Sequence, residues 1–187
     1  MPEYGSRHYW EKRYTRSDEP FDWMCDYEQL EPTLLPLLQN RSKSKKNVKI
    51  LIVGCGNANF SSDFVSRSGF DTNSVVHIDY CEVVIQQQKK GFPQLDFRVM
   101  DALDMTFDDD EFDFIIDKSL IDTTLCYFDG HKTTQKLFSE FYRVLRPNGR
   151  IVTISLHTEE EVKEFKSSDE YDYEFIVSSC KIENKRR

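Results

Sequence analysis

The sequence has few of the residues that form metal centres or disulfide bonds. Its cysteines number five, an odd count, and no two of them form a C-x-x-C pair. The four histidines show no pairing with cysteine or serine that would indicate a metal site or a nucleophilic triad. We therefore expect no metal and no disulfide framework. A reducing compartment, the cytoplasm, is the expected location.

Long hydrophobic runs are also absent. The longest, such as residues 48–53, are far shorter than the stretch of about 20 apolar residues that crosses a bilayer. Residues 1–5 contain no apolar signal core, and the acidic residues of the amino terminus argue against a transit peptide. We expect no membrane partner.

Positive charge is scarce, because 33 acidic residues stand against 25 basic ones and the net charge is −8. This balance excludes a phosphate-tracking surface over the whole protein, so direct nucleic-acid binding is not expected. Basic runs at residues 41–46 and 185–187 lack interleaved aromatic residues and are interpreted as solvated segments. A basic protein partner suits this composition better.

Aromatic and aliphatic residues are plentiful enough for one core. The length of 187 residues and the 14 phenylalanines predict a single domain. Residues 1–47 form its amino-terminal lid and linker, and residues 48–187 its α/β core. The lid is dense in aromatic side chains and should pack on the core. Within it we expect helices at residues 6–14 and 27–39, the second interrupted by Pro32 and Pro36.

Strand and helix patterns alternate through the rest of the chain. Nearly continuous β-branched and aliphatic runs predict buried strands, and spaced apolar residues predict helices between them. The expected strands are 48–53, 74–79, 96–100, 111–116, 150–155 and 173–181, and the expected helices are 59–68, 82–90, 133–145 and 159–165. A turn is expected at residues 146–149. The alternation predicts a doubly wound, mostly parallel sheet with helices on both faces.

A glycine turn ends the first expected strand. Gly54 and Gly56 lack a Cβ atom, so backbone N–H groups there can approach a ligand closely, although a tight turn without a ligand explains them equally well. Asp79 ends the second strand, 25 positions after Gly54, where an acid can accept hydrogen bonds from ribose hydroxyls. The segment after Gly56 lacks the third glycine of a pyrophosphate fingerprint. The pattern therefore favours an adenosyl sulfonium over a dinucleotide.

Acidic residues follow two further strands. Asp101 comes after the third strand, where its carboxylate could accept the adenine amino group, with a turn or cap residue as the alternative. Asp117 and Asp122 flank the end of the fourth strand, beside the expected position of a transferable methyl group. A lysine nucleophile must be neutral, and either carboxylate could orient the amine or take its proton. Capping of the following helix is an equal alternative for Asp122.

Three aromatic residues of the amino-terminal segment are candidates for covering the ligand. Trp10, Tyr14 and Trp23 could pack on an adenosine and attract a positive sulfonium. Composition alone favours ordinary hydrophobic packing for them.

Several of these motifs together resemble one enzyme family. They are Tyr9-Trp10-Glu-Lys-Arg13-Tyr14, Phe21-Asp22-Trp23, Gly54-Cys55-Gly56-Asn57, Asp79-Tyr80, Asp101-Ala102, Asp117-Lys118 with Asp122, and Arg143-Val-Leu-Arg-Pro-Asn-Gly149. In this order the chain is similar to the seven-strand S-adenosylmethionine-dependent methyltransferases related to elongation factor 1A lysine methyltransferase 4 and methyltransferase-like protein 13.

The resemblance implies S-adenosylmethionine as cofactor and a protein lysine, first of all in elongation factor 1A, as methyl acceptor. It implies cofactor contacts from ten residues: Trp10, Tyr14, Trp23, Gly54, Gly56, Asp79, Tyr80, Asp101, Ala102 and Lys118. Asp122 is the candidate catalytic residue. A small-molecule methyltransferase and a catalytically silent cofactor-binding module remain the alternatives.

The sequence departs from the family pattern at two places. Residues 118–122 read Lys-Ser-Leu-Ile-Asp where the family has Lys-Gly-Thr-Leu-Asp, which predicts an acceptor-side loop of different shape. The family also ends in an antiparallel pair of strands. Because few residues follow the strand expected at 173–181, we expect this terminal pair to be incomplete.

Overall fold

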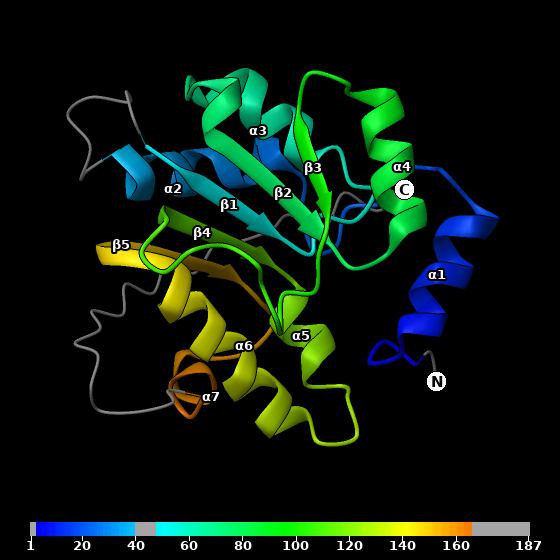
Figure 1. The fold of residues 1–187 in the computed structure, drawn as a ribbon, viewed down its shortest axis with the longest axis vertical. Helices are drawn as coiled ribbons and strands as arrows, with labels where there is room; N and C mark the ends of the chain where they lie inside the picture. Colours follow the sequence, from blue (N-terminus) through cyan, green and yellow to red (C-terminus); the bar gives the residue numbers. More distant parts are fainter. Residues whose placement is uncertain (1–2, 40–47, 166–187) are drawn as a thin grey trace.

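A computed structural model describes residues 3–39 and 48–165 of the chain. Its centre is a five-stranded sheet in the order β3-β2-β1-β4-β5, in which each neighbouring pair is parallel (Figure 1). The strands are β1 (Ile50–Val53), β2 (Val75–Asp79), β3 (Asp96–Val99), β4 (Phe112–Lys118) and β5 (Leu145–Ile154). The chain runs outward from β1 in one direction and then in the other, so the strand order reverses between β1 and β4. A ligand site is expected there.

The central strands are buried along their whole length. All four residues of β1 and all five of β2 are buried, as expected for strands covered on both faces. In the register of the sheet, Val53 lies beside Ile78 on β2 and beside Asp117 on β4. The carboxyl ends of β1, β2 and β4 are therefore level, and the residues that follow them meet at one edge.

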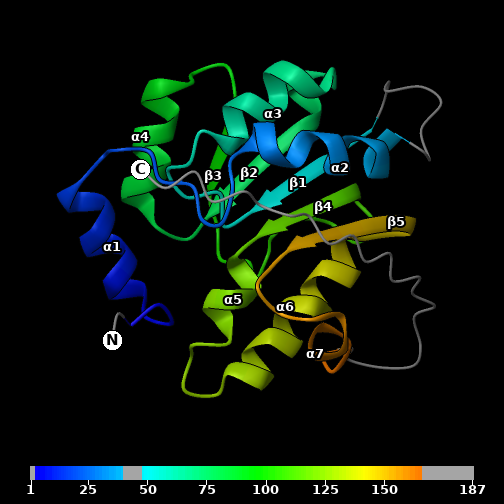
Figure 2. The same ribbon diagram turned by 180° about the vertical axis from the view of Figure 1, so that it is seen from behind.

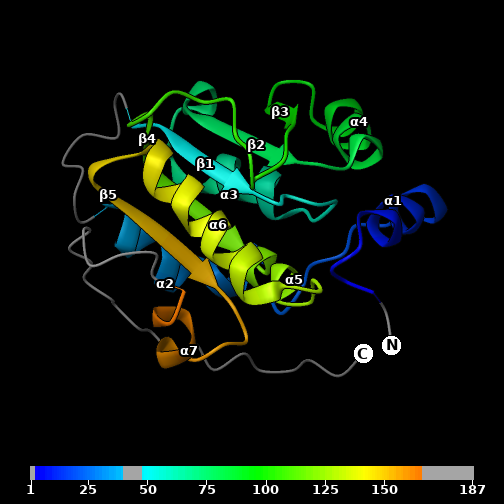
Figure 3. The ribbon, with the colours of Figure 1, turned by 60° about the horizontal axis from the view of Figure 1, so that its bottom comes forward.

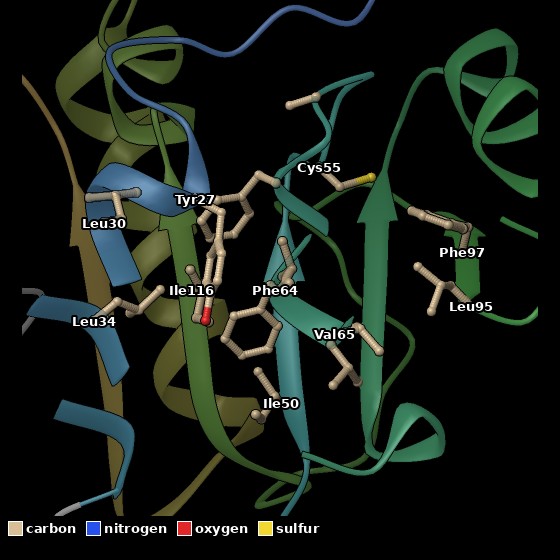
Figure 4. Packing of buried hydrophobic residues seen from close by; sticks show 14 of the residues in the cluster. Tyr27, Leu30, Leu34, Ile50, Cys55, Phe64, Val65, Leu95, Phe97 and Ile116 are labelled. Carbon is tan, nitrogen blue, oxygen red and sulfur yellow. The ribbon is translucent and has the colours of Figure 1, made fainter. Parts of the chain in front are cut away.

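Helices cover both faces of the sheet, as the alternating pattern predicts. On one face α2 (Tyr27–Gln39) and α3 (Phe60–Ser68) pack over Ile50 and Ile52 (Figure 2). On the other face α6 (Gly130–Val144) packs over Leu51 and Val53 (Figure 3). Figure 4 shows the first core, where the buried ring of Tyr27 meets Phe64 edge to face at a centroid distance of 5.8 Å.

The second helix differs from its prediction, because α2 continues through both prolines. Pro32 and Pro36 lie inside the helix and face solvent, whereas its buried residues are Tyr27, Leu30, Leu34 and Leu38. Each proline removes a backbone donor, but the apolar stripe repeats every three or four residues and holds the helix on the sheet. Tertiary packing thus overrides the local signal for an interruption.

Two other boundaries move. The structure has a short helix, α5 (Leu120–Thr124), directly after β4. The fifth strand begins at Leu145, so the turn expected at residues 146–149 lies within β5. The pairing with β4 shifts its register there, because Phe112 pairs with Leu145 whereas Phe114 pairs with Arg150. Asn148 there has a φ of 65°, which an asparagine tolerates better than most residues.

The remaining helices lie close to their predicted positions. They are α1 (Arg7–Arg16), α4 (Glu82–Gly91) and α7 (Glu159–Lys163). A 3-10 turn, η1 (Thr72–Ser74), was not predicted. Helix α1 stands beside α4, at the edge where β1 and β2 end (Figures 1 and 3). Within the described ranges, no helix combines the length and the apolar character that spanning a membrane requires. The linker at residues 40–47, the strand expected at 173–181 and the terminal strand pair lie outside the described residues.

Candidate functional site

A cavity of about 70 Å³ opens where β1, β2 and β4 end. It lies at the point of strand reversal that the topology favours for a ligand. Eight of the ten residues expected to hold a cofactor line it: Trp10, Tyr14, Trp23, Gly54, Gly56, Asp79, Tyr80 and Lys118. The fold therefore brings together residues that lie up to 108 positions apart in the sequence.

The glycine turn makes the floor of this cavity. Gly54 and Gly56 have φ angles of 60° and 56°, a conformation that residues with a Cβ atom rarely adopt. A Cβ on Gly56 would lie 2.9 Å from the hydroxyl oxygen of Tyr14, and one on Gly54 would lie 3.2 Å from Cδ1 of Leu120. Both glycines are thus required by backbone conformation and by close contact with the cavity walls.

Asp79 stands at the end of β2 and is almost completely buried. Its Oδ2 accepts a hydrogen bond from the Gly56 N–H at 3.0 Å, and its Oδ1 accepts one from the Cys81 N–H at 2.9 Å. Burial raises the pKa of Asp79 to about 6, although these two hydrogen bonds and the charge of Arg7 oppose the rise. Each oxygen keeps a further lone pair for a ligand hydroxyl.

Three aromatic residues, Trp10, Tyr14 and Trp23, form the aromatic lid of the cavity. The rings of Trp10 and Tyr14 are stacked at 5.8 Å between centroids, and Trp23 meets Trp10 edge to face at 6.0 Å. Trp10 and Tyr14 lie one helical turn apart on α1 and are buried. Burial raises the pKa of Tyr14 well above its ordinary value, so its hydroxyl stays protonated.

Hydrogen bonds fasten α1 to the core near α4. The guanidinium of Arg7 donates to the Tyr80 carbonyl at 3.0 Å and lies 5.4 Å from the centre of the Tyr80 ring. The side-chain amide of Gln87 on α4 donates to the Tyr14 carbonyl at 2.9 Å. The position of the aromatic lid therefore depends on polar contacts as well as on ring packing.

Lys118 fastens the other part of the amino-terminal segment. Its ammonium donates to the carbonyl oxygens of Trp23 at 2.9 Å and Cys25 at 3.3 Å, and lies 3.2 Å from a carboxylate oxygen of Asp22. The side chains of Lys118 and Asp22 are only 8% and 19% exposed. Burial raises the pKa of Asp22, whereas the lysine opposes that rise. This buried cluster ties Trp23 to the end of β4.

The loop at the end of β4 has a different character. Asp117 binds the first backbone N–H of α5, because its Oδ1 accepts a hydrogen bond from the Leu120 N–H at 2.8 Å. Burial raises the pKa of Asp117 to about 7, and the nearby charge of Asp122 adds to the rise. Ser119 has a φ of 72° and is 4% exposed. Within the described part of the chain, Asp117 Oδ2, Ser119 Oγ and Asp122 Oδ2 are buried without a hydrogen-bond partner.

The structure places Asp122 inside α5, so the alternative in which it caps that helix is wrong. Its Oδ1 accepts hydrogen bonds from the Leu156 N–H at 3.0 Å and the Ser155 hydroxyl at 3.2 Å. Asp122 is absent from the cavity wall, although its neighbour Thr123 belongs to it. It connects α5 to the end of β5.

Two expected contact residues stand away from the cavity wall. Asp101 is exposed, and its Oδ1 accepts a hydrogen bond from the Leu103 N–H at 2.9 Å, the geometry of a turn. Ala102 is buried in the core beneath α6. Both follow β3, the strand at the edge of the sheet.

Several wall residues did not emerge from the sequence. They are Phe21, Ile52, Val53, Cys55, Ala58, Phe60, Ser119, Leu120 and Thr123. Most are apolar and look like ordinary core residues. Ser119 had a signal, because it stands where the similar family has glycine and its backbone adopts a conformation that favours glycine.

Comparison with known proteins finds a matching family model and similar sequences. Residues 44–185 match the family model described as a methyltransferase domain. The human "eEF1A lysine and N-terminal methyltransferase" is 35% identical over 162 residues, which make up 82% of this chain and 22% of that protein. The bovine "EEF1A lysine methyltransferase 4" is 28% identical over 169 residues, 81% of this chain and 61% of that protein. The chain thus spans only part of the length of either relative.

Solved structures share the fold. A protein of Pyrococcus horikoshii superimposes with a TM-score of 0.54 at 28% identity, over 67% of this chain and 51% of its own. A TehB-like SAM-dependent methyltransferase from Corynebacterium glutamicum superimposes with the same TM-score at 19% identity, over 86% and 82% of the two chains. The second likeness concerns the fold alone.

Proposed function

Because the chain belongs to the methyltransferase domain family, we propose that it transfers methyl groups from S-adenosylmethionine to the ε-amine of a protein lysine. The observation that carries this proposal is the single cavity shared by the glycine turn, Asp79 and the aromatic lid. These parts come from three separate regions of the sequence and converge at the point of strand reversal.

The residues around the cavity fit an adenosyl sulfonium. The buried carboxylate of Asp79 has free lone pairs that can accept hydrogen bonds from ribose hydroxyls. The two glycines of the turn lack Cβ atoms, so a polar group of the ligand can reach the backbone there. The aromatic rings can contact a positive centre. The cavity volume of about 70 Å³ is smaller than the roughly 300 Å³ or more of typical ligand pockets. We therefore propose that the aromatic lid moves outward to admit the cofactor.

Each expected contact has a proposed role. The carboxylate of Asp79 accepts hydrogen bonds from the ribose hydroxyls, and Tyr80 flanks the adenine. Asp101 and Ala102 read the adenine edge, which would require Asp101 to exchange its turn hydrogen bond for one to the ligand. When bound, S-adenosylmethionine supplies an electrophilic methyl group on a sulfonium. The aromatic lid excludes water from that group and faces its positive charge.

The β4 end of the cavity is proposed to receive the acceptor amine. An amine attacks only when neutral, and a carboxylate nearby can hold it in position or take its proton. We assign this role to Asp122, whose buried Oδ2 lacks a partner among the described side chains. Asp117 is proposed to assist through its charge, since the two carboxylates interact. Lys118 is proposed to contact the cofactor while it holds Trp23 in place.

The names of two relatives indicate elongation factor 1A as the first substrate to test. We further propose that residues 1–187 act as one domain, in which residues 1–47 supply the lid and linker, and that the protein works in the cytoplasm. The cysteines at 55, 81 and 126, which form no disulfide among the described residues, support a reducing compartment.

The test is methylation of whole-cell extract with labelled S-adenosylmethionine, followed by mass spectrometry of the labelled proteins. We expect label on lysine side chains of one or a few proteins. The Asp122→Asn variant should bind S-adenosylhomocysteine as the wild type does but transfer label much more slowly. Labelled small molecules without labelled protein would contradict the proposal, as would binding of S-adenosylhomocysteine with no transfer to any component of the extract.

A further inference from the structure

A second cavity, of about 460 Å³, lies against a different face of α1 from the one that carries the aromatic lid. Its volume falls within the range of roughly 300 to 1,000 Å³ typical of ligand-binding clefts. The wall is made by Tyr9, Lys12, Arg13, Arg16, Ser17, Glu19 and Asn57, and none of these residues lines the cofactor cavity.

The periodicity of α1 explains why its side chains divide between the two cavities. Trp10 and Tyr14 are spaced by four residues and share the inner face. Tyr9, Lys12, Arg13 and Arg16 are spaced by three, four and seven residues, which places them together on a second face. One short helix therefore separates an aromatic site from a basic one.

The basic face is an exception in an acidic protein. The whole chain has a net charge of −8, yet three cations meet at this cavity and Glu19 is the single acidic residue in its wall. Across residues 3–39 and 48–165, no ion pair engages Lys12, Arg13 or Arg16. The guanidinium of Arg13 lies 4.5 Å from the centre of the Phe21 ring, which holds it at the cavity.

The second cavity adjoins the cofactor site through two shared elements. Asn57 directly follows the glycine turn, and its side-chain amide donates to the carbonyl oxygen of Glu19 at 2.6 Å. Arg13 directly precedes Tyr14 of the aromatic lid. A molecule bound in this cavity therefore contacts both the helix and the turn that enclose the cofactor site.

We propose that this cavity binds an acidic segment of the methyl-accepting protein. The inference rests on the proposed function and adds to it the chemical class of the substrate surface. Aspartate and glutamate side chains suit the site, because arginine pairs with carboxylates through two parallel hydrogen bonds and lysine contributes a flexible third charge. A segment docked there holds α1 against the core, so substrate binding and closure of the aromatic lid favour each other.

The test reverses two exposed charges that make no described contact with the lid or the core. In the variant Lys12→Glu/Arg16→Glu the cavity loses its attraction for carboxylates. The matched control is Lys89→Glu/Lys90→Glu at the end of α4, which changes the net charge equally and also alters exposed residues. Fluorescence anisotropy with labelled oligoglutamate, and with oligoglutamine as the neutral probe, measures binding directly.

We expect oligoglutamate to bind the wild type and the control alike, and the cavity variant at least about ten-fold more weakly, with a strong dependence on salt. The KM for extract protein should rise by a similar factor in the cavity variant alone. Equal binding of oligoglutamate by the two variants, or an equal KM for protein, would overturn the proposal.

Calorimetry with S-adenosylhomocysteine separates this proposal from the proposed function. Both double variants should retain wild-type affinity for the nucleoside, because neither alters the cofactor cavity. Failure of the wild type itself to bind S-adenosylhomocysteine would count against the methyltransferase function. Loss of oligoglutamate binding in the cavity variant would still support an acidic ligand.

Discussion

The two ends of the cofactor cavity satisfy their polar groups very differently. At the glycine-turn end, formed by residues 54–56 and Asp79, both carboxylate oxygens already accept backbone hydrogen bonds. At the β4 end, where Lys118, Ser119, Leu120 and Thr123 line the wall, three buried side-chain oxygens, those of Asp117, Ser119 and Asp122, have no partner among the described residues, and Ser119 adopts a strained backbone conformation. At the glycine-turn end the buried carboxylate oxygens have hydrogen-bond partners without a ligand, whereas at the β4 end three buried oxygens have none among the described residues.

This difference indicates a division of labour. A set of groups held by backbone hydrogen bonds binds a ligand with little reorganisation, which suits a cofactor used in every cycle. Buried acceptors without donors are costly, and they are explained when a substrate supplies the donor. We therefore propose that the cofactor binds at the glycine-turn end and the acceptor amine at the β4 end.

Removal of Lys118 should have the largest effect on this arrangement. Lys118→Met leaves the carboxylate of Asp22 buried without its cation, a loss on the order of 3 kcal/mol for a buried pair. Hydrogen exchange should show faster opening of residues 20–25. The matched control is Lys49→Met, which breaks the more exposed pair with Glu111 and should cost under about 1 kcal/mol.

A double-mutant cycle sharpens this prediction. Asp22→Asn removes the charge that Lys118 neutralises, so the double variant Lys118→Met/Asp22→Asn should lose less than the sum of the two single changes. Additive losses would show that the pair does not hold the amino-terminal segment. The position of Trp23 would then depend on its ring packing and on the hydrogen bond from Lys118 to its carbonyl oxygen.

The next largest effect concerns the glycine-turn end. Asp79→Ala removes the carboxylate that we assign to the ribose hydroxyls, and the affinity for S-adenosylhomocysteine should fall by about 1.5 to 3 kcal/mol, roughly ten-fold or more. Calorimetry measures this loss. Asp108→Ala, which alters an exposed carboxylate elsewhere, should leave affinity unchanged. If Asp79→Ala bound S-adenosylhomocysteine as tightly as the wild type does, the proposed contact between Asp79 and the ribose hydroxyls would be wrong.

The pH dependence of binding should follow the same carboxylate. Because the pKa of Asp79 is about 6, its proton-free form dominates above that pH, and the affinity should fall by up to about ten-fold for each pH unit below it. The contribution of Asp79 to folding stability changes with pH in the opposite sense to the affinity. The raised pKa gives a contribution to stability that is present below about pH 4 and is lost as the pH rises through 6.

Titration calorimetry between about pH 5 and 8 separates these trends, with Asp79→Asn as the reference. Asparagine does not titrate, so its weaker binding should lose this pH dependence. If the affinity changed equally with pH in both proteins, the pH dependence would have to come from another group, such as Asp117 with its pKa of about 7.

The smallest effect is expected at Ser119. Ser119→Gly should stabilise the protein by up to about 1 kcal/mol, because glycine adopts a φ of 72° without strain but adds freedom to the unfolded chain. Thermal denaturation measures the change. Ser119→Ala keeps the strain and removes the buried hydroxyl, so it separates the two causes. If the hydroxyl contacts the acceptor, Ser119→Ala should lower kcat while affinity for S-adenosylhomocysteine is unchanged.

Much of the fold was predictable because it depends on local patterns. The apolar runs before Gly54 and Asp79 are long enough to mark strands that are buried on both faces, and α2 begins and ends where its apolar period does. The sequence misled where packing overrides propensity, as at Pro32 and Pro36 inside α2. Helix α5 is too short for its periodicity to be recognised.

The candidate site, too, was predictable from the sequence in one part and not in another. By itself the sequence determined that glycines and Asp79 would stand at the ends of neighbouring strands, since residue spacing and strand burial dictate both. Only the tertiary structure decided that Lys118 would hold Asp22 and Trp23, almost a hundred positions earlier in the chain. Such contacts depend on how the amino-terminal segment packs over the sheet edge, and no local periodicity encodes that packing. The same packing turned the second face of α1 into the wall of a basic cavity.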